Sequence, residues 1–247
     1  MRPRSSLRTS LAAFAMGLAS ACQADVPAPQ PEIDERAEIG LMGTIPIYWG
    51  ESGDFGDVLA GGAEPHWARA RIEARHPLRP LDALDGGSLA TLDFLILAQP
   101  RALTPAENVA LDDWLRAGGK LLLFADPMLT GESRFAIGDR RRPQDVILLS
   151  PILARWGIEL EFDDSAPPEY RLVHTAGGPI PVNWPGRLIA RQGEADCTLE
   201  QEVLADCRIG RGRAVIVADA ALLDLHEAHP AAPAALDWLV SSAFNNR

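Results

Sequence analysis

The chain has 247 residues, of which 47% are hydrophobic and 23% are charged, values that are ordinary for a globular protein. This length is enough for one α/β domain with a sizeable core. The formal net charge is −11 at pH 7, and a surface this acidic repels phosphate backbones, which argues against nucleic acid as a partner.

The first 21 residues have the pattern of a secretory signal peptide. Three arginines and no acidic residue precede a short apolar run over residues 11–21 that ends in small side chains. A membrane-spanning helix needs about 20 apolar residues, so this run is too short to be one. We expect residues 1–21 to be removed when the protein is exported.

Cys22 directly follows this run in the sequence LASAC, which resembles a bacterial lipobox. Lipidated at Cys22, the protein would be attached to a membrane on its periplasmic side. Gln23 after the cysteine, rather than an aspartate, favours the outer membrane over the inner one. The alternative is a soluble periplasmic protein with an unpaired cysteine. Residues 22–37 are rich in proline and are expected to form a disordered tether.

Short apolar runs along the chain have the composition of strands. A β-like run over residues 37–50 is expected to open the domain. Residues 93–98 and 120–125 are apolar on both faces, which is typical of strands in a covered parallel sheet. A further buried strand is expected at residues 214–218, after a glycine turn.

The segment between the runs at 93–98 and 120–125 has the clearest helix pattern in the chain. Thr104 is a natural N-cap, Pro105 suits the first helical position and Glu107 completes a capping box. Two glycines at residues 118–119 allow a left-handed exit. Strand, helix and strand joined by short links predict a right-handed βαβ unit.

The second half of the chain repeats this pattern less regularly. Residues 150–157 predict a helix with Ser150 as its cap, and residues 158–162 alternate as a strand with one wet face does. Residues 163–206 contain many prolines and glycines between short β-like pieces, which predicts a β-rich excursion. Residues 233–244 predict a last helix against the core.

Three of these stretches, taken together, match a known family. They are LTPAENVALDDWLRAGGKLLLFADP, LLSPILARWGIELEFDD and GRGRAVIVADAALLD. In this order and spacing they resemble the extracytoplasmic auxiliary domain of ABC-type transport systems of the gliding-motility type. The resemblance runs from about Glu38 to Phe244.

The resemblance implies an α/β domain over residues 38–247, a three-layer sandwich with a mainly parallel central sheet. The implied fold is flavodoxin-like or class I glutamine-amidotransferase-like, without a working amidotransferase triad. It also implies a non-catalytic role beside a transporter or an envelope complex. Members of the family usually have membrane-spanning helices, whereas no segment after Cys22 is long and apolar enough. A separate lipoprotein that uses the same domain is therefore expected.

Two further cysteines, Cys197 and Cys207, are close in sequence. In an oxidising compartment an even pair at this distance indicates a disulfide. A metal pair is the alternative, but no third and fourth ligands stand at the spacing of a zinc site. We therefore expect a disulfide and no metal.

Polar residues follow the predicted strands at the edge where α/β proteins bind ligands. Asp126 follows one buried strand, and Gln99, Glu51 and Asp219 are its expected neighbours at the same edge. These residues form a candidate strand-edge binding site. The alternative is that Asp126 and the following proline only end a strand, because aspartate stabilises turns and proline cannot extend a ladder.

The sequence offers neither a G-x-S-x-G elbow nor a free cysteine nucleophile, so no catalytic residue and no cofactor are expected. We expect a non-catalytic envelope lipoprotein domain that binds a transporter or another envelope protein. One alternative is an envelope hydrolase that uses Asp126, Asp219 and a histidine. Another is a binder of carbohydrate or peptidoglycan that uses Trp49, Trp67 and Trp184.

Overall fold

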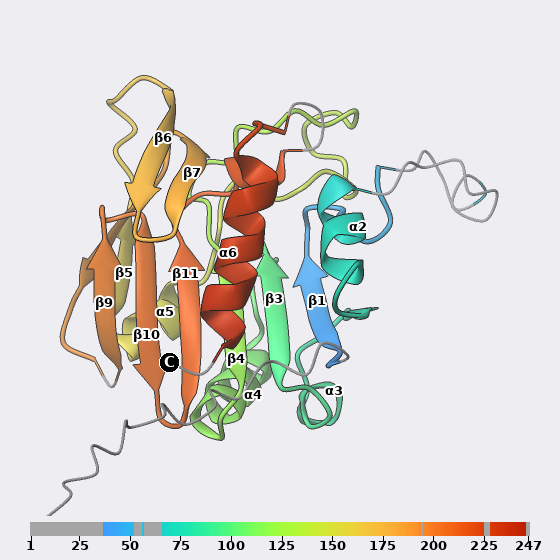
Figure 1. The fold of residues 1–247 in the computed structure, drawn as a ribbon, viewed down its shortest axis with the longest axis vertical. Coiled ribbons are helices and arrows are strands. Elements are labelled where there is room, and N and C mark those ends of the chain that lie inside the picture. The colour runs from blue at the N-terminus through green and yellow to red at the C-terminus, as the bar shows by residue number, and fades with distance from the viewer. Residues whose placement is uncertain (1–36, 52–55, 57–65, 194, 225–227, 246–247) are drawn as a thin grey trace, which may run out of the picture. The chain divides into compact units, whose positions relative to one another are not determined.

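A seven-stranded sheet lies at the centre of the computed structural model, with the strand order β2-β1-β3-β4-β11-β10-β9 (Figure 1). Neighbouring strands from β2 to β11 are parallel, whereas β10 and β9 are antiparallel. The predicted α/β fold with a mainly parallel sheet is therefore confirmed. The strands are β1 Ile39–Gly43, β2 Leu78–Pro80, β3 Phe94–Ala98, β4 Lys120–Phe124, β9 Asp196–Glu200, β10 Leu204–Ile209 and β11 Gly212–Val217.

The structure describes residues 37–51, 56, 66–193, 195–224 and 228–245. All of them belong to one unit that runs from Pro31 to Arg247. The predicted signal peptide, Cys22 and residues 23–36 of the predicted tether lie outside the described residues. Within the described ranges, no helix combines the length and the hydropathy that crossing a membrane requires.

Helices cover both faces of the sheet and give the molecule three layers. Side chains of β3 alternate: Phe94 and Ile96 belong to one core cluster, and Leu95 and Leu97 to the other. The first core is closed by α2 (Trp67–Glu73) and by α6 (Ala232–Phe244), which lies across the sheet in Figure 1. The second core is closed by α3 (Gly86–Leu89), α4 (Pro105–Arg116) and α5 (Ser150–Trp156).

The helix predicted between β3 and β4 forms as the sequence indicates. Thr104 caps α4 by accepting the N–H of Glu107, and the Glu107 carboxylate accepts the N–H of Thr104 in return. Leu111 and Leu115 face the core. The predicted cap of α5 is wrong, because Ser150 is already helical and Leu149 occupies the N-cap without a side-chain bond.

The first strand is shorter than predicted, because β1 ends at Gly43 instead of continuing towards residue 50. A Cβ at Gly43 would lie 2.0 Å from the carbonyl oxygen of Ala98, so only glycine fits where β1 approaches β3. Pro46 has no N–H and cannot extend the ladder. The chain turns there instead, with the N–H of Gly50 bonded to the Pro46 oxygen at 2.9 Å.

Two small antiparallel sheets accompany the central one. The hairpin of β6 (Tyr170–Thr175) and β7 (Gly178–Asn183) forms one, and β5 (Ile158–Glu161) pairs with β8 (Arg187–Ala190) in the other. Within the range predicted as a β-rich excursion, β6, β7 and β8 are thus separate from the central sheet. β9 and the first residues of β10 extend the central sheet instead.

Candidate functional site

The carboxyl ends of β1, β3, β4 and β11 bring Thr44, Gln99, Asp126 and Asp219 to one edge of the sheet. Gln99 has a left-handed φ of 49°, which turns its side chain towards Asp126. The Gln99 amide accepts the Asp126 N–H and donates to the Asp126 carbonyl, both at 2.9 Å. Thr44 Oγ1 donates to the Gln99 carbonyl at 2.6 Å. Thr44, Gln99 and Asp126 are therefore joined by hydrogen bonds to one another.

The two edge carboxylates hold backbone segments together. Asp126 accepts N–H bonds from Met128 at 2.9 Å and from Ala220 at 3.0 Å. Asp219 accepts the N–H of Asn183 at 2.9 Å and the N–H two residues further on at 2.7 Å. Relative exposure is 0% for Asp126 and 1% for Asp219. Each carboxylate oxygen is thus bonded to the backbone and shielded from solvent.

Burial also changes the acidity of this pair. It raises the pKa of Asp126 to about 6 against two backbone hydrogen bonds that lower it. The pKa of Asp219 is raised well above its usual range, first by burial and then by the charge of Asp126. Buried carboxylate pairs can act as acid and base when substrate reaches them. Here, among the described residues, no hydrogen bond joins either carboxylate to a histidine.

Glu51 does not join the other predicted edge residues. Its carboxylate accepts the hydroxyl of Ser133 at 2.5 Å and the N–H of Arg134 at 2.9 Å. It therefore fixes the loop that contains these two residues. The structure brings together Gln99, Asp126 and Asp219, and it leaves Glu51 in a different set of contacts.

The predicted disulfide between Cys197 and Cys207 is present. The two cysteines are direct register partners on β9 and β10, with a Cα–Cα distance of 4.0 Å. Across the described ranges, no group of three or more histidine, cysteine, aspartate or glutamate side chains is arranged to hold a metal ion.

The tryptophans named for carbohydrate stacking differ in their surroundings. Trp49 is 56% exposed. The Trp67 indole donates to the Asp224 carbonyl at 3.1 Å, and the Trp184 ring packs against Phe162 with centroids 4.9 Å apart. No two of these three tryptophans have a ring contact with each other among the described residues.

A buried histidine also has a structural position. His66 caps α2 by accepting the N–H of Ala68 at 3.0 Å, and its second ring nitrogen lies 2.9 Å from the Leu223 oxygen. Burial lowers the pKa of His66 against the effect of that backbone contact. A neutral imidazole that donates to Leu223 fits this geometry.

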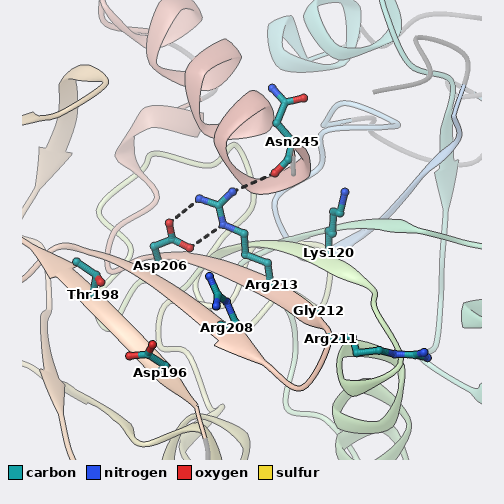
Figure 2. A pocket seen from close by; sticks show the side chains of 9 residues that line it. All are labelled: Lys120, Asp196, Thr198, Asp206, Arg208, Arg211, Gly212, Arg213 and Asn245. Atoms are coloured by element: carbon teal, nitrogen blue, oxygen red, sulfur yellow. Dashed lines mark hydrogen bonds and ion pairs between the residues drawn. The ribbon is translucent and has the colours of Figure 1, made fainter. Parts of the chain in front are cut away.

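A basic pocket of about 240 Å³ lies at the opposite end of the strands, where β4 and β11 begin and β10 ends. Figure 2 shows the guanidinium of Arg213 between the Asp206 carboxylate and the backbone oxygen of Asn245. The sequence of this hairpin predicts only a glycine turn, although three arginines within six residues are unusual in an acidic chain. The pocket is lined by Lys120, Asp196, Thr198, Asp206, Arg208, Arg211, Gly212, Arg213 and Asn245.

Three of the four cations in this pocket bind carbonyl groups at helix ends. Lys120 Nζ donates to the Phe244 oxygen of α6 at 2.8 Å, and Arg213 donates to Asn245, which caps the same helix, at 3.2 Å. Arg211 donates at 2.8 Å to the carbonyl that caps α4. Cations are favourable at helix C-termini, where unpaired carbonyls carry partial negative charge.

Residues 70–185, somewhat less than half of the chain, match the family described as an ABC-type uncharacterized transport system. The matched segment begins within α2 and ends after β7, so it includes Gln99 and Asp126. The disulfide and the arginines of the basic pocket lie beyond it. No curated protein matches the sequence.

Solved structures show only weak likenesses. The chain is 15% identical to an exo-β-1,4-mannosidase from an Opitutaceae bacterium, with a TM-score of 0.48 over 86% of this chain and 36% of that one. It is 10% identical to a putative ThuA-like protein from Bacteroides uniformis, with a TM-score of 0.47 over 88% and 93%. The chain thus spans about a third of the mannosidase, and likenesses this weak carry nothing about activity.

Proposed function

We propose that this protein is a non-catalytic envelope domain that is attached to a membrane by a lipid on Cys22 and binds a protein of an ABC-type transport system. The match of residues 70–185 to an auxiliary family of such systems supports the transport connection. The LASAC sequence supports the lipid, and the Cys197–Cys207 disulfide fits an oxidising compartment.

The proposal of a non-catalytic role depends on the burial of the polar side chains at the carboxyl ends of the strands. Ligands of open α/β sheets bind outside the carboxyl ends of the strands. At that edge, both carboxylates are buried and each of their oxygens accepts a backbone N–H. Catalysis needs a reactive group that substrate can reach, and Asp126 and Asp219 are instead used to join loops. In a binding role, the domain would contact its partner through exposed residues of its outer surface.

Photo-crosslinking in intact cell envelopes tests the partner. Val109 on α4 and Ile137 in the loop between β4 and α5 are apolar and exposed, at 61% and 87%, so a crosslinking amino acid at either position should leave the core intact. We expect at least one position to give a defined adduct with a transporter component. The proposal would be contradicted if the chain is folded and exported but gives no crosslink to a defined protein at either position.

Membrane attachment is tested separately through Cys22. The chain should incorporate radiolabelled palmitate and sediment with membranes, and Cys22→Ala should abolish both without changing the circular dichroism spectrum. A matched control is provided by the double variant of Cys197 and Cys207 to alanine, which should still be labelled. Equal labelling of the wild type and the Cys22→Ala variant would disprove lipidation at this residue.

A further inference from the structure

We propose that the basic pocket binds a phosphate group, and that Arg208 is its principal contact. The ligand class is a phosphate oxyanion, either free or as part of a phospholipid headgroup. This site goes beyond the proposed function, because its arginines lie outside the segment that matches the auxiliary family. The proposal depends on the register of the strands rather than on the lipid or the transporter partner.

The strand register places three cations side by side on one face of the sheet. Arg208 of β10 is the direct partner of Arg213 on β11, and Arg213 is in turn the direct partner of Lys120 on β4. Like charges directly opposite each other on neighbouring strands are destabilising. Asp196 of β9 is the direct partner of Arg208 on its other side and offsets part of that repulsion. An anion bound between the three cations would offset more of it.

The charge of the pocket matches a doubly charged anion. Four cations and two acids line it, which gives a formal excess of two positive charges in a chain whose net charge is −11. Arg213 is engaged with Asp206 through two of its nitrogens. Arg and Lys carry five and three N–H donors, respectively. Lys120 and Arg211 each use one in the bonds to helix ends, so donors remain for phosphate oxygens.

Three of the four cations are also held in place before any ligand arrives. Lys120 and Arg213 are anchored to the end of α6, and Arg211 to the end of α4. Binding to groups that are already fixed loses less conformational entropy than binding to mobile ones. Thr198 adds a hydroxyl to the lining, and a volume of about 240 Å³ suits a phosphate group rather than a larger ligand.

Arg208 differs from the other three cations. Its side chain is exposed, and none of the described residues forms a hydrogen bond or an ion pair with its guanidinium. Arg208 and Asp206 lie two residues apart on β10, so they share a face of the sheet and point towards the same hollow, as Figure 2 shows. Substituting Arg208 therefore removes a ligand contact without removing a helix cap.

The test uses inorganic phosphate as the probe, with potassium chloride at matched ionic strength as the reference. The full chain carrying Cys22→Ala is titrated by calorimetry, and so is the same chain with Arg208→Gln or Arg75→Gln added. Arg75 is an exposed arginine outside the pocket, so its substitution makes the same change in net charge. We expect phosphate to bind, Arg208→Gln to weaken binding at least tenfold, and Arg75→Gln to leave it within twofold.

Flotation with vesicles separates the two sources of phosphate. Binding of inorganic phosphate that depends on Arg208 supports the proposal with a free ligand. Arg208-dependent binding to phosphatidylglycerol vesicles, but not to phosphatidylcholine vesicles, supports it with a lipid headgroup. The proposal is overturned if neither probe binds, or if Arg208→Gln and Arg75→Gln weaken binding equally.

Thermal unfolding provides a second measurement that does not require a ligand. Because Arg208 lies between Arg213 on one side and Asp196 on the other, Arg208→Gln should change the unfolding temperature in chloride buffer little and should reduce the stabilisation that phosphate gives. A lower unfolding temperature of this variant in both buffers, with an unchanged response to phosphate, would show that Arg208 supports the fold instead of a ligand.

Discussion

Asp126 should control the pH dependence of stability between about pH 4 and pH 7. Burial raises the pKa of this carboxyl from 3.8 to about 6 in the folded protein. The folded state therefore holds the proton more tightly than the unfolded state does. Stability from this group is fully present below the unfolded pKa and is lost as the pH rises through the folded pKa.

The size of this loss follows from the shift. A change of about two pKa units corresponds to roughly 3 kcal/mol, at about 1.4 kcal/mol per unit. Carboxylates with lowered pKa act in the opposite direction but at lower pH. The pKa of Glu107 is lowered to about 2, mainly by its bond to Arg101, so its contribution to the free energy of unfolding changes only below about pH 4.5. The interval from pH 4.5 to 7.5 therefore excludes Glu107. It includes His66, whose lowered pKa makes stability rise with pH, but this contribution is the same in the wild type and in Asp126→Asn.

Asp126→Asn removes the titrating group and keeps the shape of the side chain. Asparagine has one acceptor oxygen where the carboxylate has two, so the N–H of Met128 or of Ala220 loses its partner. A buried donor left in this way costs about 1–3 kcal/mol at every pH. The variant should thus be less stable than the wild type at pH 4.5, and the difference should shrink or reverse by pH 7.5.

Urea unfolding at intervals of one pH unit measures both effects as free energies of unfolding. We expect the wild type to lose roughly 2 kcal/mol more than Asp126→Asn between pH 4.5 and 7.5, because part of the full change lies below pH 4.5, with a residual slope from Asp219. Asp113→Asn, at an exposed position on α4, is the matched control and should keep the wild-type slope. Equal slopes for the wild type and Asp126→Asn would refute the assignment of this pH dependence to Asp126.

Three further predictions concern stability. Glu107→Gln should lower the free energy of unfolding by about 2 kcal/mol, because its buried carboxylate accepts backbone and arginine bonds; a change below 0.5 kcal/mol in urea unfolding would contradict this. Replacing Cys197 and Cys207 by alanine should cost about 2–3 kcal/mol, and calorimetry should then give the same unfolding temperature with and without reductant. Gln201 and Glu202 have left-handed φ values of 51° and 57° in the β9–β10 turn, so an Asn-Gly pair there should stabilise the protein by about 1–2 kcal/mol; a decrease would show that these side chains matter for another reason.

The parts of the fold that depend on local chemistry could be predicted from the sequence. The capping box of Thr104 and Glu107 and the apolar run of β4 need only neighbouring residues, and both are present. β2 was missed because three residues that end in Pro80 form a strand only through pairing with β1. The shortened β1 likewise depends on the close approach of Gly43 to another strand.

The same distinction applies to the candidate sites. Gln99, Asp126 and Asp219 could be grouped because the carboxyl ends of parallel strands meet at one edge. Their burial could not be foreseen, because it depends on the loops that cover them. The row of Arg208, Arg213 and Lys120 depends on the register between three strands, and register is not local information.

The cross-strand position of the Cys197–Cys207 bond has a consequence for how the chain folds and oxidises. β9 is the outermost strand on its side of the sheet, where unpaired backbone groups can recruit another molecule. A slip of one residue between β9 and β10 would direct the two sulfurs to opposite faces, so oxidation requires the native hairpin. Once formed, the bond prevents β9 from leaving its own sheet. The fraction of molecules with free Cys197 and Cys207 thiols under oxidising conditions would therefore measure how many have not formed the native β9–β10 hairpin.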